Sequence, residues 1–173
     1  MGRSDRLTRL SSTVVRLVRG ANLLAGFAFL AALLGGALAH GMIDARLTAK
    51  YGVEIGRSAY DLLRLIVLLA LLTSYAVERL CRALLAILDS IKRGEPFATA
   101  NAAHLRTIGW MLLLIQLLDL GLGAVSIYAR SLPIDFVEWQ PSLTGWIAVL
   151  VAFVLARVFT VGAAMRDDLE GTV

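Results

Sequence analysis

The stretch IKRGEPFATANAAHLRTIG, residues 91–109, is the longest polar interval between two strongly apolar halves of the chain. Gly94 can adopt the left-handed backbone conformation that ends a helix, and Pro96 cannot continue one. Thr99 or Asn101 can then cap the next helix by accepting its free amide protons. The stretch therefore predicts a tight helical hairpin. The alternative is a surface that docks a partner, because several basic residues gather here: Lys92, Arg93, His104 and Arg106.

Composition indicates a membrane protein. Charged residues make up only 17% of the 173 residues and hydrophobic residues 58%, whereas soluble domains carry roughly 25% charged residues. Four apolar segments approach the roughly 20 residues that a spanning helix needs. We predict an all-α fold, a four-transmembrane-helix bundle forming one integral membrane domain over residues 1–173, with helices at about 21–43, 59–91, 100–130 and 143–166.

The N-terminal apolar run at residues 21–39 follows five arginines and ends in Ala37-Leu38-Ala39, which mimics a signal-peptidase site. A signal peptide has an apolar region of about 7–15 residues, and this run is longer, so we expect a retained membrane helix rather than a cleaved leader. The basic arm is interpreted as a topology and anionic-lipid signal rather than a nucleic-acid site. Small or polar residues that share a face with Phe29 predict a packing seam on this helix: Asn22, Ala25, Ala32, Gly36 and Ala39.

Positive charge is distributed unequally over the connections. Four spans place both termini and the 91–109 stretch on one side, with eleven Lys and Arg residues against four on the other side. Because positive residues favour the cytoplasmic side, we predict a multi-pass protein of the bacterial inner membrane with both termini in the cytoplasm. The single cysteine, Cys81, excludes an internal disulfide.

The second span carries an unusual face on which polar and apolar residues alternate at helical spacing: Asp61, Arg64, Leu68, Leu71, Tyr75, Glu78, Arg82, Leu85 and Asp89. The helical pattern of apolar residues continues to Ile91, beyond the length that a bilayer requires. We therefore expect one long helix from about residue 59 to residue 91, with its last turns extended into the cytoplasm.

The third span contains a candidate intramembrane polar cluster. Asp119 lies near the middle of the span and shares a face with Gln116. A carboxylate at this depth costs ~2.5–3.5 kcal/mol, so it should face the bundle interior and either have a partner or be protonated. Arg157 in the fourth span is the candidate partner of Asp119, and Glu78 is the rival carboxylate for Arg157. Three interpretations stay open: a structural Asp119–Arg157 pair, a functional site for a proton, ion or ligand, and snorkelling without pairing.

Residue patterns of common catalytic and metal sites are absent from the sequence. His40 and His104 are expected on opposite membrane faces, and no Cys/His spacing suggests zinc. There is no phosphate-binding glycine loop and no nucleophile elbow. We therefore predict no catalytic, cofactor-binding or metal-binding residues, and we expect that the protein is not an enzyme.

The 91–109 stretch and the C-terminus together resemble a family of small bacterial four-helix membrane proteins known as domain of unknown function 2975. The turn motif of that family is matched here by Gly94, Pro96, Phe97, Asn101, Leu105 and Arg106. Its ending is matched by Phe159, Gly162, Asp167, Asp168, Thr172 and Val173, while Arg157 stands where members often have a small acidic or polar residue. The resemblance implies a four-helix inner-membrane protein with no established activity. Some relatives are encoded beside small helix-turn-helix regulators, which suggests such a regulator as a partner.

Two functions are compatible with these observations. The first is a non-enzymatic inner-membrane protein that docks or regulates a cytoplasmic or membrane partner through residues 79–106 and the C-terminal tail. The second is a small transporter or permeation protein that uses Gln116, Asp119 and Arg157 as an internal polar site. The expected partners are the lipid bilayer and such a cytoplasmic or membrane protein, and a homo-oligomer is compatible with the sequence. We expect no cofactor and no direct contact with nucleic acid.

Overall fold

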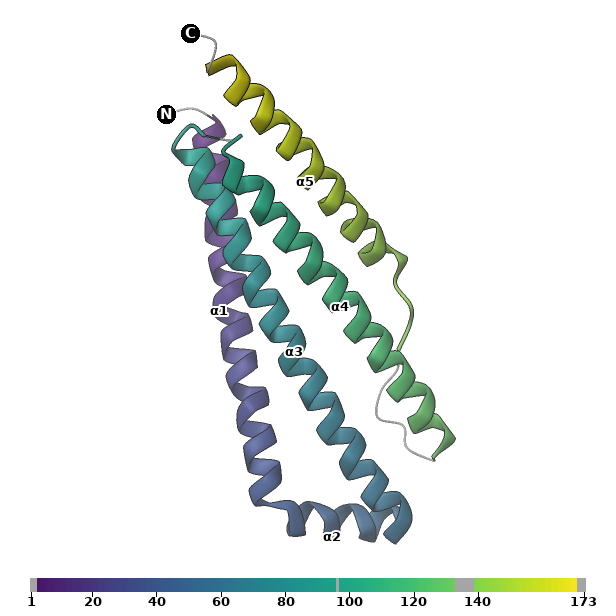
Figure 1. Cartoon of the computed structure of the whole chain (residues 1–173). Coiled ribbons are helices and arrows are strands. Elements are labelled where there is room, and N and C mark those ends of the chain that lie inside the picture. The colour runs from purple at the N-terminus through teal and green to yellow at the C-terminus, as the bar shows by residue number, and fades with distance from the viewer. Residues whose placement is uncertain (1–2, 96, 133–138, 171–173) are drawn as a thin grey trace. The chain divides into compact units, whose positions relative to one another are not determined.

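The computed structural model describes residues 3–95, 97–132 and 139–170, with side chains described throughout except at residues 3–5, 51, 54 and 166–170. Within these ranges the secondary structure consists of helices alone (Figure 1). In chain order they are α1 (Arg3–Leu38), α2 (His40–Tyr51), α3 (Val53–Lys92), α4 (Thr99–Ser131) and α5 (Leu143–Glu170).

The all-α prediction is confirmed, and the fold has the make-up of a multi-pass membrane protein. Four helical segments are long and apolar enough to cross a membrane: Arg6–Leu38, Ile55–Lys92, Thr99–Ser131 and Leu143–Met165. Helices suit this role because each one satisfies its own backbone hydrogen bonds, which hydrocarbon cannot do.

Two parts of the helical structure extend beyond the predicted spans. α1 begins at Arg3, well before the apolar run, because arginine and leucine favour helix and no proline interrupts residues 3–38. α1 ends at Leu38, and α2 takes up residues 40–43, which the sequence assigns to the end of the first span, together with the first half of the polar connection that follows. It ends at Gly52, whose φ of +89° lies in the left-handed region that glycine adopts without strain.

The chain divides into two compact units, and each is described here by itself. The turn unit consists of Met1–Asn22, Ala76–Leu114 and Leu143–Val173. The loop unit consists of Leu23–Tyr75 and Ile115–Ser142. Helices α1, α3 and α4 each contribute one part to the turn unit and another to the loop unit.

The loop unit has a small core where α3 meets α4. The buried residues Ala59, Leu62, Val125 and Ala129 form it, and partly buried leucines and isoleucines pack around them: Leu47, Ile55, Ile66, Leu69 and Leu132. Helix α2 lies crosswise between the end of α1 and the start of α3 (Figure 1). The Tyr60 hydroxyl donates a 3.1 Å hydrogen bond to the Gly36 carbonyl, which ties α3 to α1.

The turn unit has its own core of Ala83, Ile108 and Ala152, contributed by α3, α4 and α5. Gly109 is buried here because the ring of Phe153 lies over it, and a Cβ at this position would lie 3.1 Å from the ring. The same ring meets Trp110 edge-on at a centroid distance of 5.4 Å. A small residue therefore allows α5 to approach α4 closely, which is the usual route to helix contact in membranes.

Gly56→Ala should lower the free energy of unfolding by about 1–3 kcal/mol, a typical cost of overpacking. The new Cβ would lie 2.8 Å from the Thr48 amide nitrogen and 2.9 Å from its Cα, and this backbone cannot rotate away as a side chain could. Thermal unfolding in detergent measures the effect. Gly41→Ala is the matched control, since its Cβ meets no atom within 4 Å. Equal melting temperatures for the two variants would contradict the tight α2–α3 contact.

Candidate functional site: the turn between α3 and α4

Gly94 ends α3 in the manner that the sequence predicts. Its φ is +81°, and α3 stops at Lys92. The Glu95 amide donates a 3.0 Å hydrogen bond to the Ser90 carbonyl, and the Gly94 amide donates a 3.0 Å bond to the Ile91 carbonyl. Together these bonds form a Schellman motif, which satisfies the last carbonyls of the helix. Pro96, the next residue of the predicted turn motif, lies outside the described residues.

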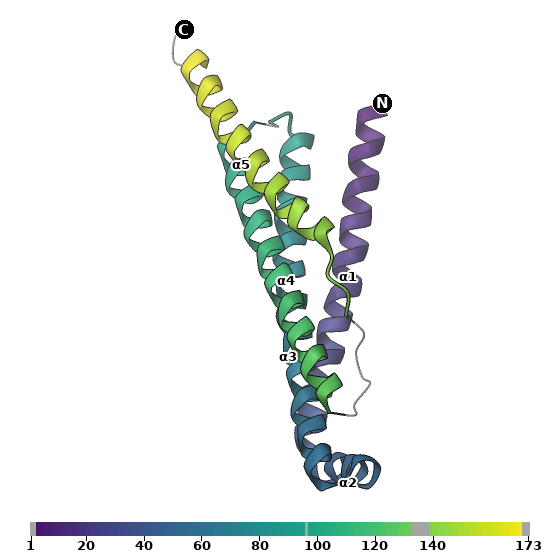
Figure 2. The ribbon, with the colours of Figure 1, turned by 90° about the vertical axis from the view of Figure 1, so that its right-hand side faces the viewer.

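Helices α3 and α4 flank the turn (Figure 2), and the Asn101 side chain links them. Its side chain is 1% exposed, and its Nδ2 donates a 2.6 Å hydrogen bond to the Ser90 Oγ on α3. Ser90 is also buried and donates from Oγ to the Ile87 carbonyl at 2.8 Å. The sequence suggests Asn101 as a helix cap. In the structure its amide fastens the start of α4 to the end of α3.

The turn motif packs against the C-terminal motif of the chain. Phe97 stacks on Phe159 of α5 with ring centroids 5.5 Å apart, and a Cβ added to Gly162 would lie 3.4 Å from the Phe97 ring. These residues are some sixty positions apart in sequence, yet they meet within the turn unit. Leu105, another motif residue, packs on the core of Ala83, Ile108 and Ala152. The other residues that match the C-terminal motif, Asp167, Asp168, Thr172 and Val173, have no described side chains.

An exposed basic and aromatic rim surrounds this packed base. Phe97 is 48% exposed and Trp110 is 54% exposed. The exposed cations on the two helices and the turn are Arg79, Arg82, Lys92, Arg93 and Arg106, and His104 is half-buried. Two carboxylates partly offset this charge, because Glu95 lies 3.9 Å from the Arg93 Nε and Asp89 lies 3.3 Å from the Lys92 Nζ. Five Lys and Arg residues against these two carboxylates leave residues 79–106 with a net positive charge.

Glu78 is the buried charged residue of the turn unit, and it has two arginine partners. The Arg19 Nε on α1 donates to Glu78 Oε1 at 2.9 Å, and the Arg82 Nε, one turn along α3, donates to the same oxygen at 2.8 Å. The Glu78 side chain is 9% exposed, whereas those of Arg19 and Arg82 are 37% and 60% exposed. From the sequence alone, Glu78 is expected only as a rival partner for Arg157, and its contact with Arg19 is not predicted.

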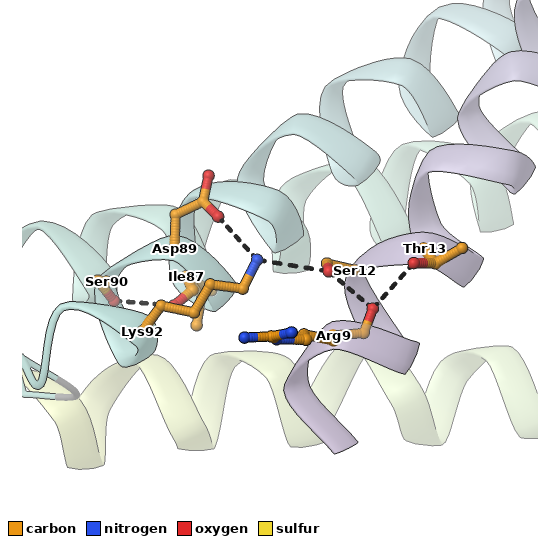
Figure 3. Close-up of polar contacts among 7 residues, drawn as sticks. All are labelled: Arg9, Ser12, Thr13, Ile87, Asp89, Ser90 and Lys92. Atoms are coloured by element: carbon orange, nitrogen blue, oxygen red, sulfur yellow. Dashed lines mark hydrogen bonds and ion pairs between the residues drawn. The ribbon is translucent and has the colours of Figure 1, made fainter. Parts of the chain in front are cut away.

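A second polar contact joins α1 to α3 nearer the turn (Figure 3). The Lys92 ammonium lies 3.4 Å from the Ser12 Oγ and 3.3 Å from the Asp89 carboxylate. Ser12 is buried, and its hydroxyl donates to the Arg9 carbonyl at 2.9 Å. The Arg19–Glu78 and Ser12–Lys92 contacts both lie on one face of α1, which the spacing of seven residues between Ser12 and Arg19 could have indicated.

The predicted intramembrane cluster is spread over both units. Asp119 is half-buried on the loop-unit part of α4, and within that unit it forms no ion pair with a described residue. Gln116, one turn earlier, donates to the Ser142 carbonyl at 3.5 Å. Arg157 is exposed on α5 in the turn unit. The pairing of Asp119 with Arg157 stays a prediction.

The described side chains offer no grouping of three His, Cys, Asp or Glu residues that could hold a metal ion. His40 packs instead edge-on against Tyr60, with ring centroids 4.6 Å apart. The arrangement at the turn consists of packing contacts, hydrogen bonds and exposed charge.

The protein has the features of a small all-α membrane protein. Its helices are long and apolar, and contacts of Gly94, Phe97 and Asn101 hold the turn between α3 and α4. Residues 21–173 match the family described as "Protein of unknown function (DUF2975)", and the chain belongs to this family. Searches of curated proteins and of solved structures find no match.

Glu78→Gln should lower the free energy of unfolding by about 1–3 kcal/mol, because both arginines lose a charged acceptor and a buried neutral amide replaces it. Arg82→Gln should cost less, about 0.3–0.5 kcal/mol, since this pair is local and exposed. Arg79→Gln is the control, because Arg79 is exposed and forms no ion pair with a described residue. The melting temperatures of the three variants are measured in detergent. A melting temperature of Glu78→Gln as high as that of Arg79→Gln would contradict the prediction.

Proposed function

We propose that the protein is a non-enzymatic docking protein of the bacterial inner membrane, with both termini in the cytoplasm. Its docking surface is the rim of the turn unit, residues 79–106, together with the C-terminal tail. The observation that carries the proposal is the exposed cations and aromatic rings on a turn that buried hydrogen bonds hold rigid. Rigid presentation lowers the entropy cost of binding, and aromatic and arginine side chains are frequent anchors of interfaces.

The length of α3 supports a cytoplasmic position for this surface. Forty residues extend over about 60 Å at ~1.5 Å per residue, against about 30 Å for the hydrocarbon core. The charged residues of its last part, from Glu78 to Lys92, favour water or headgroups over acyl chains. The excess of Lys and Arg on this side agrees with the positive-inside rule.

The charge of the rim predicts an acidic partner surface, because complementary charge steers association and sets specificity. A helix-turn-helix transcription regulator is the partner that the family resemblance suggests. In this proposal the regulator is held at the membrane through its acidic surface, and the docking protein itself does not contact nucleic acid.

Changing three rim cations to glutamine, at Arg79, Arg93 and Arg106, should weaken partner binding at least ~10-fold, which corresponds to ~1.4 kcal/mol. The partner is recovered by cross-linking in native membranes, identified and purified, and its affinity for the full chain in detergent is then measured. The matched control changes three exposed cations of the loop unit, at Arg46, Arg57 and Arg130. Recovery of no partner, or equal loss of affinity in both variants, would overturn the proposal.

A small transporter or permeation protein is the second candidate, favoured by the half-buried Asp119 within a candidate span. Asp119→Asn and Arg157→Gln distinguish the two roles. If the residues form a structural pair, each single change lowers the melting temperature and the neutral double change restores it. If Asp119 serves transport, Asp119→Asn abolishes proton or ion flux in proteoliposomes, and the double variant does not restore that flux.

A further inference from the structure

One face of α1 is covered by α3 along its length. Its residues recur at steps of three and four, and all of them are buried or half-buried: Ser12, Val15, Arg19, Asn22, Gly26, Phe29, Leu33 and Gly36. In the turn unit, Arg19 and Ser12 contact Glu78 and Lys92 of α3. In the loop unit, the Gly36 carbonyl accepts from Tyr60, and a Cβ at Gly26 would lie 2.7 Å from the Ser74 Oγ. This face therefore has its partner within the chain.

The opposite face of α1 carries a second stripe, which we call the open stripe. It also advances by steps of three and four, and every member is exposed: Leu7, Leu10, Val14, Leu17, Ala21, Leu24, Ala28, Ala31, Gly35 and Leu38. Leu10, Leu17 and Leu24 are 66%, 69% and 74% exposed. At about 100° per residue, the two stripes lie roughly 150° apart around the helix. A strict alternation of three and four is the a/d spacing of a coiled coil.

The composition of the open stripe changes along the helix in a way that favours a helix as its occupant. Beside the arginines the stripe is large and apolar, from Leu7 to Leu17, as a coiled-coil seam in water requires. Within the apolar run it becomes small at Ala21, Ala28 and Gly35, where close backbone approach drives association in lipid. Bulky apolar residues, which suit contact with acyl chains, lie off the stripe at Leu23, Phe27 and Leu30.

The hydrocarbon core alone does not cover the whole stripe. Leu7–Leu17 lies in a segment with four arginines between residues 6 and 19, which does not suit the hydrocarbon core. A helix that passes from a polar into an apolar environment at the same level as α1 can cover the stripe from end to end. A second α1 in parallel orientation has this property by symmetry. An antiparallel copy would place the arginine-bearing half against residues 24–38, inside the apolar span.

The charges of α1 permit a parallel copy. Arg9 and Arg16 lie at positions remote from the stripe, and Arg19 lies on the opposite face with Glu78. One flank of the stripe is small or short at every seventh residue, through Ser11, Val18, Ala25 and Ala32. Arg6 lies on the other flank, where a parallel register sets it beside Ser11 of the second copy. Two copies can therefore approach along the stripe without bringing arginines face to face. In a closed two-fold dimer each residue of the stripe meets its own copy.

We propose that the open stripe is a homodimer interface, in which α1 of one chain packs in parallel on α1 of a second copy. A Cβ at Gly35 would meet no atom within 4 Å in the single chain, so this position is available to the partner helix. The interface uses residues of α1, whereas the proposed docking surface uses residues 79–106. The dimer can therefore be tested independently of the proposed function.

Cysteine cross-linking of the full chain in membranes tests the register. In a Cys81→Ser background, Leu10→Cys and Leu17→Cys should form disulfide dimers at least ~5-fold faster than Arg9→Cys and Arg16→Cys, because only facing positions of a parallel pair bring Cβ atoms within the ~3.5–4.5 Å that a disulfide needs. The controls are exposed neighbours one residue away. Equal rates for the two pairs, or monomers throughout, would overturn the proposal and leave lipid or another protein as the occupant.

A second measurement uses chains labelled at the N-terminus and needs no cross-link, and it leaves the buried Cys81 in place. Gly35→Leu should weaken dimerisation at least ~10-fold in vesicles, measured by energy transfer between labelled chains, because the added side chain separates the backbones. The monomer should keep its melting temperature, since the space beside Gly35 is open. Gly41→Leu is the matched control on α2, also with no atom within 4 Å of its Cβ. Unchanged transfer in Gly35→Leu contradicts the proposed interface.

Discussion

The packing of α1 in the turn unit depends on the Glu78 carboxylate. A buried carboxylate is costly unless charged donors satisfy it, and here Arg19 from α1 and Arg82 from α3 both do so at hydrogen-bonding distance. Because Arg19 comes from another helix, the cost of burying Glu78 is offset only when α1 presents this face. The contact therefore sets the rotation of α1 about its axis. Once that rotation is set, the leucine-rich stripe on the other side of α1 must point away from α3.

The turn between α3 and α4 separates residues that hold the structure from residues that face outward. Ser90, Asn101 and Gly94 satisfy buried or helix-terminal polar groups. Phe97 rests on Phe159 and Gly162, so the two family motifs form one contact region of the turn unit. Arg93 and Arg106 lie beside this base and are exposed. A surface built in this way can lose the charge of these two residues without losing its fold.

Much of the fold could be predicted because its signals are local. The four apolar runs and the left-handed glycine that ends α3 each depend on a few neighbouring residues. The helix at residues 40–51 could not be found in this way, because its sequence lacks a strong apolar face and contains a glycine. Asn101 shows another limit. The side chain that can cap its own helix through Oδ1 can also donate from Nδ2 to a serine eleven positions away, and only the approach of α3 to α4 brings that serine within reach.

By itself, the sequence determined an all-helical chain with four spans and a sharp turn near its middle, since apolar runs of this length must satisfy their backbone internally. It also identified Glu78 and Asp119 as charges that need an explanation. Only the tertiary structure decided that Arg19 is the partner of Glu78, that Phe97 meets Phe159, and that one stripe of α1 is covered while the other is open. The reason is geometric. Each residue turns a helix by about 100°, so contacts between helices depend on axial rotations that no local pattern specifies.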